Sequence, residues 1–182
     1  MIADALGERV LERCLSKAGL SESIIDTAGF YIPEIAINRV FDIAAQNAGD
    51  EHFGLHLAER LSVRDYGAWG DYVLEGTTLL AALKRAARII HLHAVNDTLE
   101  IRQGPSSTYF RYTFGERRTA GYQQTALAAL GPLLSIPRHF LGSQWRPLSI
   151  GVDLNQTKSE ARISDWIGTE VRSDRKCIYL EI

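Results

Sequence analysis

Apolar residues recur at helical spacing through most of the first half of the chain. Residues 3–17 place leucine, valine and cysteine on one face, which predicts a helix that ends at Gly19. Ser21 then begins a short helical turn. The next apolar stripe predicts a helix with Pro33 in its first turn and Gly49 at its end.

Three more helices are expected before residue 95. Residues 50–61 have one apolar face, with Asp50 as the N-cap. Residues 69–74 form a short helix, and a longer, alanine-rich helix begins after Thr78, whose hydroxyl suits an N-cap.

The period changes from helical to alternating at about Asn96. "DTLEIRQG" and "STYFRYTF" alternate apolar and polar positions and are joined by "GPSS", so an antiparallel hairpin is predicted. Helix returns at about Thr119. Gly131-Pro132 is expected to kink or break that helix, because proline lacks the amide and clashes with the preceding turn, and Pro137 to restart it.

The last forty residues predict strand, helix and two strands. "LSIGVDL" alternates as a strand, and "TKSEARISDWIG" is a helix whose capping box joins Thr157 and Glu160. "TEVRS" and "KCIYLEI" are expected to pair as a closing hairpin around Asp174. The predicted fold class is α+β, with a helical N-terminal half packed on a small, largely antiparallel sheet formed mainly by the C-terminal half. Residues 1–182 are taken as one domain.

Composition and charge limit the classes of function and the cellular locations that are expected. A formal charge of −2 disfavours direct binding of nucleic acid, which relies on clustered Lys and Arg. Cys14 and Cys177 stand alone at opposite ends of the chain, which favours free thiols in a reducing cytosol over a disulfide. The N-terminus has no signal-peptide pattern, and no stretch has the ~18 apolar residues of a membrane span. A cytoplasmic location is therefore expected.

No pattern for catalysis or for a metal ion is found. His52 and His56 share a helix face, but no third ligand accompanies them, so neither a metal nor a cofactor is expected. His91 and His93 end a helix, where a protonated imidazole is stabilised, and one of them can also line a pocket. There is no serine elbow, activated cysteine or phosphate-binding glycine loop, so the chain is not expected to be an enzyme.

Aromatic residues are concentrated at the junction of helices and strands: Tyr66, Trp69, Tyr72, Tyr109, Phe110, Tyr112 and Phe114. Such rings build cores, and with a few polar groups they also line apolar ligand pockets. Arg111 is one polar candidate, although its strand position favours solvent. The residues predicted to bind a ligand are Trp69, Tyr72, His93, Phe110, Tyr112 and Gln124.

The segment "DEHFGLHLAERLSVRDYGAWGDYVLEGTTLLAALKRAARII" resembles the N-terminal effector-binding region of AraC/XylS transcriptional regulators, in the branch with an arabinose-binding-like domain. The resemblance runs from about Leu6 to Ile182. It rests on weak positions in order, among them Ile32-Pro33, Gly49-Asp50, Phe53-Gly54-Leu55, Gly67, Gly70, Tyr72, Thr78-Leu79, Arg88, Pro147 and Gly168. Two departures are Ala81, where relatives often carry an acid, and Gly131-Pro132, in a helix that is commonly continuous.

The resemblance implies a sensor domain that binds a small-molecule effector, forms a homodimer and controls an attached DNA-binding domain by population shift. That C-terminal module of about 100 residues carries two helix-turn-helix units, and no pattern for it is found in residues 1–182. DNA would be contacted only through it. The alternative is a stand-alone small-molecule sensor or protein-interaction domain without DNA output.

Overall fold

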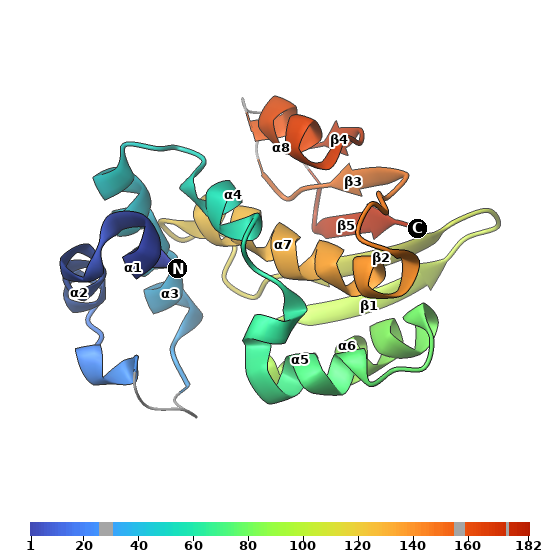
Figure 1. Cartoon of the computed structure of the whole chain (residues 1–182), viewed down its shortest axis with the longest axis horizontal. Helices are drawn as coiled ribbons and strands as arrows, with labels where there is room; N and C mark the ends of the chain where they lie inside the picture. Colours follow the sequence, from blue (N-terminus) through green and yellow to red (C-terminus); the bar gives the residue numbers. More distant parts are fainter. Residues whose placement is uncertain (26–30, 155–158, 174) are drawn as a thin grey trace. The chain divides into compact units, whose positions relative to one another are not determined.

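The computed structural model describes residues 1–25, 31–154, 159–173 and 175–182 and contains two compact units (Figure 1). The first unit consists of residues 1–60 and 116–129, and the second of residues 61–115 and 130–182. The chain therefore leaves the first unit, forms about half of the second, and returns to the first before finishing in the second.

The first unit is helical. Its elements are α1 (Ile2–Leu6), α2 (Glu8–Lys17), the 3₁₀ turn η1 (Glu22–Ile24), α3 (Glu34–Ala48), α4 (Phe53–Ala58) and the start of α7 (Tyr122–Leu141). The single helix predicted over residues 3–17 is wrong, because Gly7, at φ 90°, separates α1 from α2. Asp50 is not the N-cap of α4; that residue is His52, whose amide donates to the Asp50 carboxylate.

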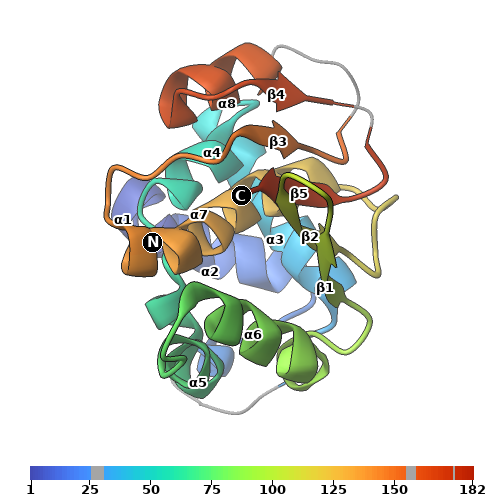
Figure 2. The same cartoon turned by 90° about the vertical axis from the view of Figure 1, so that its right-hand side faces the viewer.

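The second unit combines helices with the sheet. Its other elements are η2 (Val63–Tyr66), α5 (Gly67–Leu74), α6 (Leu79–His93), β1 (Thr98–Gln103), β2 (Thr108–Thr113), β3 (Ser149–Gly151), α8 (Ser159–Ile167), β4 (Val171–Arg172) and β5 (Ile178–Glu181). The strand order is β1-β2-β5-β3-β4, and only the β3–β4 pair is parallel. Both views show β5 lying inside the sheet between β2 and β3 (Figure 2). The α+β prediction is confirmed.

The predicted closing hairpin is wrong. β4 pairs with β3 in parallel, and β5 pairs with β2 and β3. The apolar side chains of β5, Ile178 and Leu180, are fully buried with β5 as an inner strand, whereas a hairpin with β4 would leave them near an edge. Asp174, the expected turn residue, and Thr157, the expected cap of α8, lie outside the described residues.

Helix α7 runs unbroken from Tyr122 to Leu141. Of the predicted kink or break at Gly131-Pro132, the break is therefore wrong, and so is a restart at Pro137, which lies inside the helix. An interior proline costs about 3 kcal/mol. Burial of a large apolar side chain contributes about 1.5–3 kcal/mol, and four such residues flank the prolines. These buried residues are Leu130, Leu133, Leu134 and Ile136. Their burial outweighs the loss at the prolines.

The two faces of the sheet differ in chemistry. One face carries buried apolar side chains, namely Leu99, Phe110, Ile178 and Leu180, and α6 packs beside β1. The alternate positions carry charged and aromatic side chains that are not buried, namely Glu100, Arg102, Tyr109, Arg111 and Tyr179. This second face is called the outer face below.

Candidate functional site

The segment that leads into α5 is closely packed because it contains glycine. Ser62 and Asp65 form a reciprocal capping box around η2. A Cβ at Gly70 would lie 1.8 Å from the Val63 carbonyl oxygen, so no other residue fits without a backbone shift. This close approach of η2 and α5 orients the side chains of Tyr66 and Trp69.

Tyr66, Trp69 and His93 form an aromatic cluster in the second unit. Trp69 and His93 stack with ring centroids 5.2 Å apart and planes at 25°, and Tyr66 meets the His93 ring edge-on at 4.8 Å. Two predicted ligand-binding residues, Trp69 and His93, are therefore brought together. Tyr66 completes the cluster. It was noted among the concentrated aromatic residues of the sequence but was not among the residues predicted to bind a ligand.

The aromatic cluster shifts the titration of two of its members. Burial raises the pKa of Tyr66 to about 12, with a smaller contribution from the Asp65 carboxylate. Burial also lowers the pKa of His93, against an opposing effect of Asp97. The Trp69 indole N–H is buried and has no acceptor within the part of the chain that the structure describes. It is an available donor in an otherwise apolar contact.

Tyr72 does not join the aromatic cluster. The Arg85 guanidinium lies over its ring, 3.8 Å from the centroid, and the Arg85 Nε donates to the Tyr72 carbonyl. Glu75 holds the same guanidinium in a 2.6 Å ion pair. The face of the Tyr72 ring is thus covered by a side chain of the unit itself.

The remaining predicted residues have internal contacts. Phe110 is 1% exposed and lies between Ile101 and Leu180 on the apolar face. The Tyr112 hydroxyl donates to the Asp97 carboxylate, and its ring contacts Phe114 edge-on. Phe110 is therefore a core residue, and Tyr112 is half-buried with internal partners.

Gln124 belongs to the first unit, whereas the other five predicted residues belong to the second. Its side-chain oxygen accepts from the Gly54 amide at 2.8 Å, and its amide nitrogen donates to the Glu51 carbonyl at 2.9 Å. Gln124 is buried, and both ends of its amide are occupied. It connects the entry of α4 to the start of α7.

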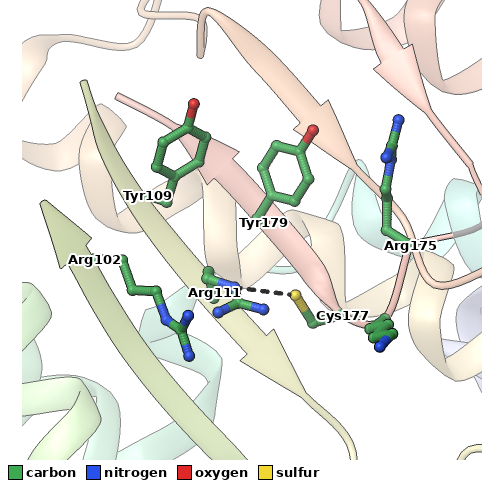
Figure 3. Close-up of a pocket in the computed structure, with 7 residues that line it drawn as sticks. Arg102, Tyr109, Arg111, Arg175, Cys177 and Tyr179 are labelled. Atoms are coloured by element: carbon green, nitrogen blue, oxygen red, sulfur yellow. Dashed lines mark hydrogen bonds between the residues drawn. The ribbon is translucent and has the colours of Figure 1, made fainter. Parts of the chain in front are cut away.

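A depression of about 450 Å³ lies on the outer face of the sheet (Figure 3). Its lining residues come from β1, β2, β5 and the segment before β5: Arg102, Tyr109, Arg111, Arg175, Lys176, Cys177 and Tyr179. They share one face because the register pairs Arg102 with Tyr109 and Arg111 with Tyr179.

Tyr109 and Tyr179 form an aromatic wall on neighbouring strands. Their ring centroids lie 5.7 Å apart at an interplanar angle of 75°. The Tyr179 ring lies against Gly151 of β3, where a Cβ would be only 2.0 Å from Cε1. Because Gly151 has no side chain, the Tyr179 ring can lie along the sheet over the adjacent strand. The Tyr109 hydroxyl donates to Glu181.

Arg111 lies between β1 and β5 at the base of the depression. Its Nε donates to the Cys177 sulfur at 3.3 Å, and its Nη1 contacts Glu100 at 3.2 Å (Figure 3). The expectation that Arg111 points to solvent holds only in part, because its side chain is 25% exposed. In the sequence, the alternate positions Tyr109 and Arg111 indicated one face of a strand. Only the pairing of β2 with β5 shows that Tyr179 lies on the same face.

The family model described as "Arabinose-binding domain of AraC transcription regulator, N-term" matches residues 10–182. The chain belongs to this family. The arabinose-binding domain family is the N-terminal sensing part of AraC-type transcription regulators, so the resemblance read from residues 6–182 is confirmed.

Solved structures agree on the fold of the arabinose-binding domain. The transcriptional regulator CdpR from Pseudomonas aeruginosa superposes with a TM-score of 0.65 at 12% identity. The match covers 96% of this chain and 53% of CdpR, so the chain spans about half the length of that regulator. No match was found among curated protein sequences.

A second structure, described as "Modulating Heme Redox Potential Through Protein-Induced Porphyrin Distortion", has a TM-score of 0.50 at 16% identity. The match covers 77% of the present chain and 75% of the chain in that second structure. At this level of identity the likeness concerns the fold of the arabinose-binding domain alone.

The histidines of the arabinose-binding domain do not form a metal site with other ligands in the described residues. Within the described ranges, no group of three or more His, Cys, Asp or Glu side chains is placed to hold a metal ion. His56 instead contacts the Asp50 carboxylate at 3.0 Å, and His52 is buried. Among the described helices, none has the length and hydropathy to cross a membrane.

Proposed function

We propose that the domain binds a small-molecule effector in the depression on the outer face and so controls an attached C-terminal helix-turn-helix DNA-binding domain. The observation that carries this proposal is the depression itself, in a chain whose family is the sensing part of a regulator. Its volume of about 450 Å³ falls within the usual range of small-molecule sites.

The strand that lines the depression also offers a route for the signal. Tyr179 contributes to the lining, and only three positions later Ile182 exchanges two backbone hydrogen bonds with Thr108 of β2. A DNA-binding domain joined after Ile182 would be attached at the end of β5. A ligand that favours one arrangement of β2 and β5 would then bias the presentation of that domain, with a coupling of typically 1–3 kcal/mol.

Several further expectations belong to this proposal. The domain forms a homodimer, acts without catalysis or a cofactor, and contacts DNA only through the attached module. Its location is the cytoplasm, where the promoter lies. The second candidate, a stand-alone sensor without DNA output, uses the same depression and differs only in lacking the attached module.

The test combines a ligand screen with two variants. Small molecules that raise the melting temperature of the 1–182 chain are collected, and an effector at 100 times its Kd is expected to add about 2.7 kcal/mol. That increment corresponds to a rise of roughly 5–10 °C for a chain of this size. Tyr179→Ala, which removes one wall of the depression, should abolish the rise.

Trp69→Leu distinguishes the depression from the predicted aromatic site. The rise in melting temperature should persist in Trp69→Leu, because Trp69 lies in the aromatic cluster and not in the depression. Loss of the rise in Trp69→Leu with retention in Tyr179→Ala would place the effector at the aromatic cluster. In the full-length regulator, the same ligands should change the affinity for promoter DNA; a ligand that binds without this change favours the stand-alone sensor.

A further inference from the structure

The charged residues that line the depression all carry the same sign. Arg102, Arg111, Arg175 and Lys176 are cationic, and no carboxylate is among the lining residues that the structure describes. Two carboxylates, Glu100 and Glu181, lie at the margin on the same face. Because the cations outnumber these carboxylates, the potential over the depression is positive, although the whole chain has a charge of −2.

Both carboxylates at the margin are already engaged. Glu100 contacts Arg102 and Arg111, each at 3.2 Å. Glu181 accepts from the Tyr109 and Ser149 hydroxyls, and these hydrogen bonds hold its pKa below the usual range. Both carboxylates therefore already have donors within the chain, which weakens them as competing acceptors for a ligand.

Two arginines retain donors for a ligand. Arg111 uses Nε and Nη1, and no acceptor for its Nη2 is present in the described parts of the chain. Arg175 extends from the segment before β5 beside Tyr179 (Figure 3), and its guanidinium has no partner among described residues. A guanidinium donates in a planar fork that matches carboxylate and phosphate oxygens.

The lining offers many more donors than acceptors. Arginine and lysine side chains have no acceptor; the Tyr109 hydroxyl gives its proton to Glu181, so toward a ligand it presents only its oxygen, as an acceptor. A neutral sugar presents hydroxyls that both donate and accept, so such a lining leaves many of its protons unpaired. A group that only accepts, such as a carboxylate or phosphate, has no such deficit.

The aromatic wall selects the rest of the ligand. Tyr109 and Tyr179 meet edge to face, and Gly151 leaves the Tyr179 ring lying along the sheet. Aromatic contacts of this kind contribute about 0.5–1.5 kcal/mol beyond their buried area. A planar ring can contact the tyrosines while its anionic group pairs with a guanidinium beside them, that of Arg111 or that of Arg175.

We infer that the depression binds a small organic anion in which a planar ring carries a carboxylate or phosphate, in preference to a neutral sugar. The inference rests on the proposed function, since it names the chemical class of the effector for that same site.

The test uses matched probes on the 1–182 chain: benzoate, phenyl phosphate, the neutral isostere benzamide, and L-arabinose. Isothermal titration calorimetry at low salt and at 0.5 M salt gives the affinities. Benzoate or phenyl phosphate should bind at least tenfold more tightly than benzamide and should weaken severalfold at high salt. Whichever anion binds more tightly identifies the anionic group.

Arg175→Gln should weaken binding of the anion about three- to tenfold, because it removes one charged donor at an exposed position. Arg162→Gln is the matched control: Arg162 is an exposed arginine of α8, outside the depression, and the substitution changes the net charge equally. Arg162→Gln should leave the affinity unchanged. Equal weakening in both variants would mean attraction by net charge alone and would overturn the inference.

The inference and the proposed function fail differently. If L-arabinose binds, Tyr179→Ala abolishes that binding and neither anion competes, the depression is the effector site but the anionic class is wrong. If neither anion binds, the inference is overturned whatever else is found. If, in addition, every ligand found by the screen depends on Trp69 and not on Tyr179, the proposed site fails as well.

Discussion

Gly70 shows how a single residue determines the entry to α5. Its missing side chain lets α5 approach the Val63 carbonyl, which a Cβ would reach at 1.8 Å. Gly67 has the other property of glycine, a positive φ of 55°, with open space where a Cβ would stand. The same short segment therefore uses one glycine for close approach and the other for backbone conformation.

Gly70→Ala should lower the free energy of unfolding more than Gly67→Ala. The conformation at Gly67, with φ 55° and ψ −138°, is one that other residues rarely adopt and costs them about 1–3 kcal/mol. Overpacking at Gly70 forces a backbone shift and is expected to cost about 3 kcal/mol. Urea denaturation of both variants measures the difference. A loss in Gly70→Ala no greater than in Gly67→Ala would contradict the close packing of η2 and α5.

Tyr66 should make stability fall at high pH. Its pKa is raised to about 12 in the folded chain, from about 10 when unfolded. The neutral phenol is thus favoured by folding, and its contribution is complete below pH 10 and is lost as the pH rises toward 12. Relative to Tyr66→Phe, which does not titrate, the wild type should lose about 1 kcal/mol by pH 11.

That comparison is made by urea denaturation of both chains at pH 8, 10 and 11. Other lysines and tyrosines titrate equally in the two chains, so the difference isolates Tyr66. A difference that is constant from pH 8 to pH 11 would show that Tyr66 is solvated in the folded chain.

His93 should titrate below the usual pH of histidine. Burial lowers its pKa, so folding favours the neutral imidazole, and the associated stability is present above about pH 6.5 and lost as pH falls through the folded pKa. NMR titration of the imidazole measures that pKa directly. Trp69→Leu removes the stacked ring and should move the pKa back toward 6.5; no change in that variant would show that the indole does not desolvate His93.

At the scale of elements, α7 and η2 are joined by Ser135. Its hydroxyl accepts from the Val63 amide at 2.8 Å and donates to the Pro132 carbonyl at 2.7 Å. The hydroxyl thus bonds to the turn that contains the proline and to the beginning of η2 at once. The Ser135 hydroxyl thereby links α7, which contains two interior prolines, to η2.

Ser135→Ala should lower the free energy of unfolding by about 1–3 kcal/mol, because it leaves the amide of buried Val63 without its acceptor. Ser143→Ala, at an exposed serine after α7, is the matched control and should change stability by less than about 0.5 kcal/mol. Equal effects of the two substitutions in chemical denaturation would contradict the bridging role of Ser135.

Local patterns predicted the elements but not their pairing. The β1–β2 hairpin and the Thr78 cap of α6 followed from alternation and from a hydroxyl at a helix start, and both are confirmed. The position of β5 between β2 and β3 is a long-range choice, decided by which edges can bury Ile178 and Leu180. The persistence of α7 through Pro132 is likewise a tertiary effect, since the proline alone argues for a break.

At the scale of the whole molecule, each of the two units buries one free thiol. Cys14 and Cys177 are both free and buried, and they belong to different units. Burial raises the pKa of the Cys14 thiol. Both sulfurs are therefore chemically protected while the chain is folded.

Thiol labelling checks this arrangement. Without reductant, a maleimide should modify both cysteines in denaturant and neither at an appreciable rate in the native chain. Mass spectrometry counts the added groups. Failure to label either cysteine in denaturant would indicate a disulfide, and rapid native labelling of Cys177 would show that its contact with Arg111 is open to solvent.

The candidate site was only partly visible in the sequence. The pairing of Trp69 with His93 joins two predicted residues, but Gln124 lies in the other unit, and Phe110 is enclosed by its sheet neighbours. Arg175 and Lys176 were not singled out, since an exposed basic pair usually belongs to an ordinary surface. Only the strand order brings them beside Arg111 and Tyr179.

The inner position of β5 also has a consequence for synthesis on the ribosome. The hairpin of β1 and β2 emerges first, and its β2 edge must remain unpaired while the chain for α7, β3, α8 and β4 is made, at about 5–20 residues per second. For several seconds the nascent chain therefore presents an open strand edge, the kind of surface that invites aggregation. Only the arrival of residues 178–181 closes that edge and joins the two parts of the sheet.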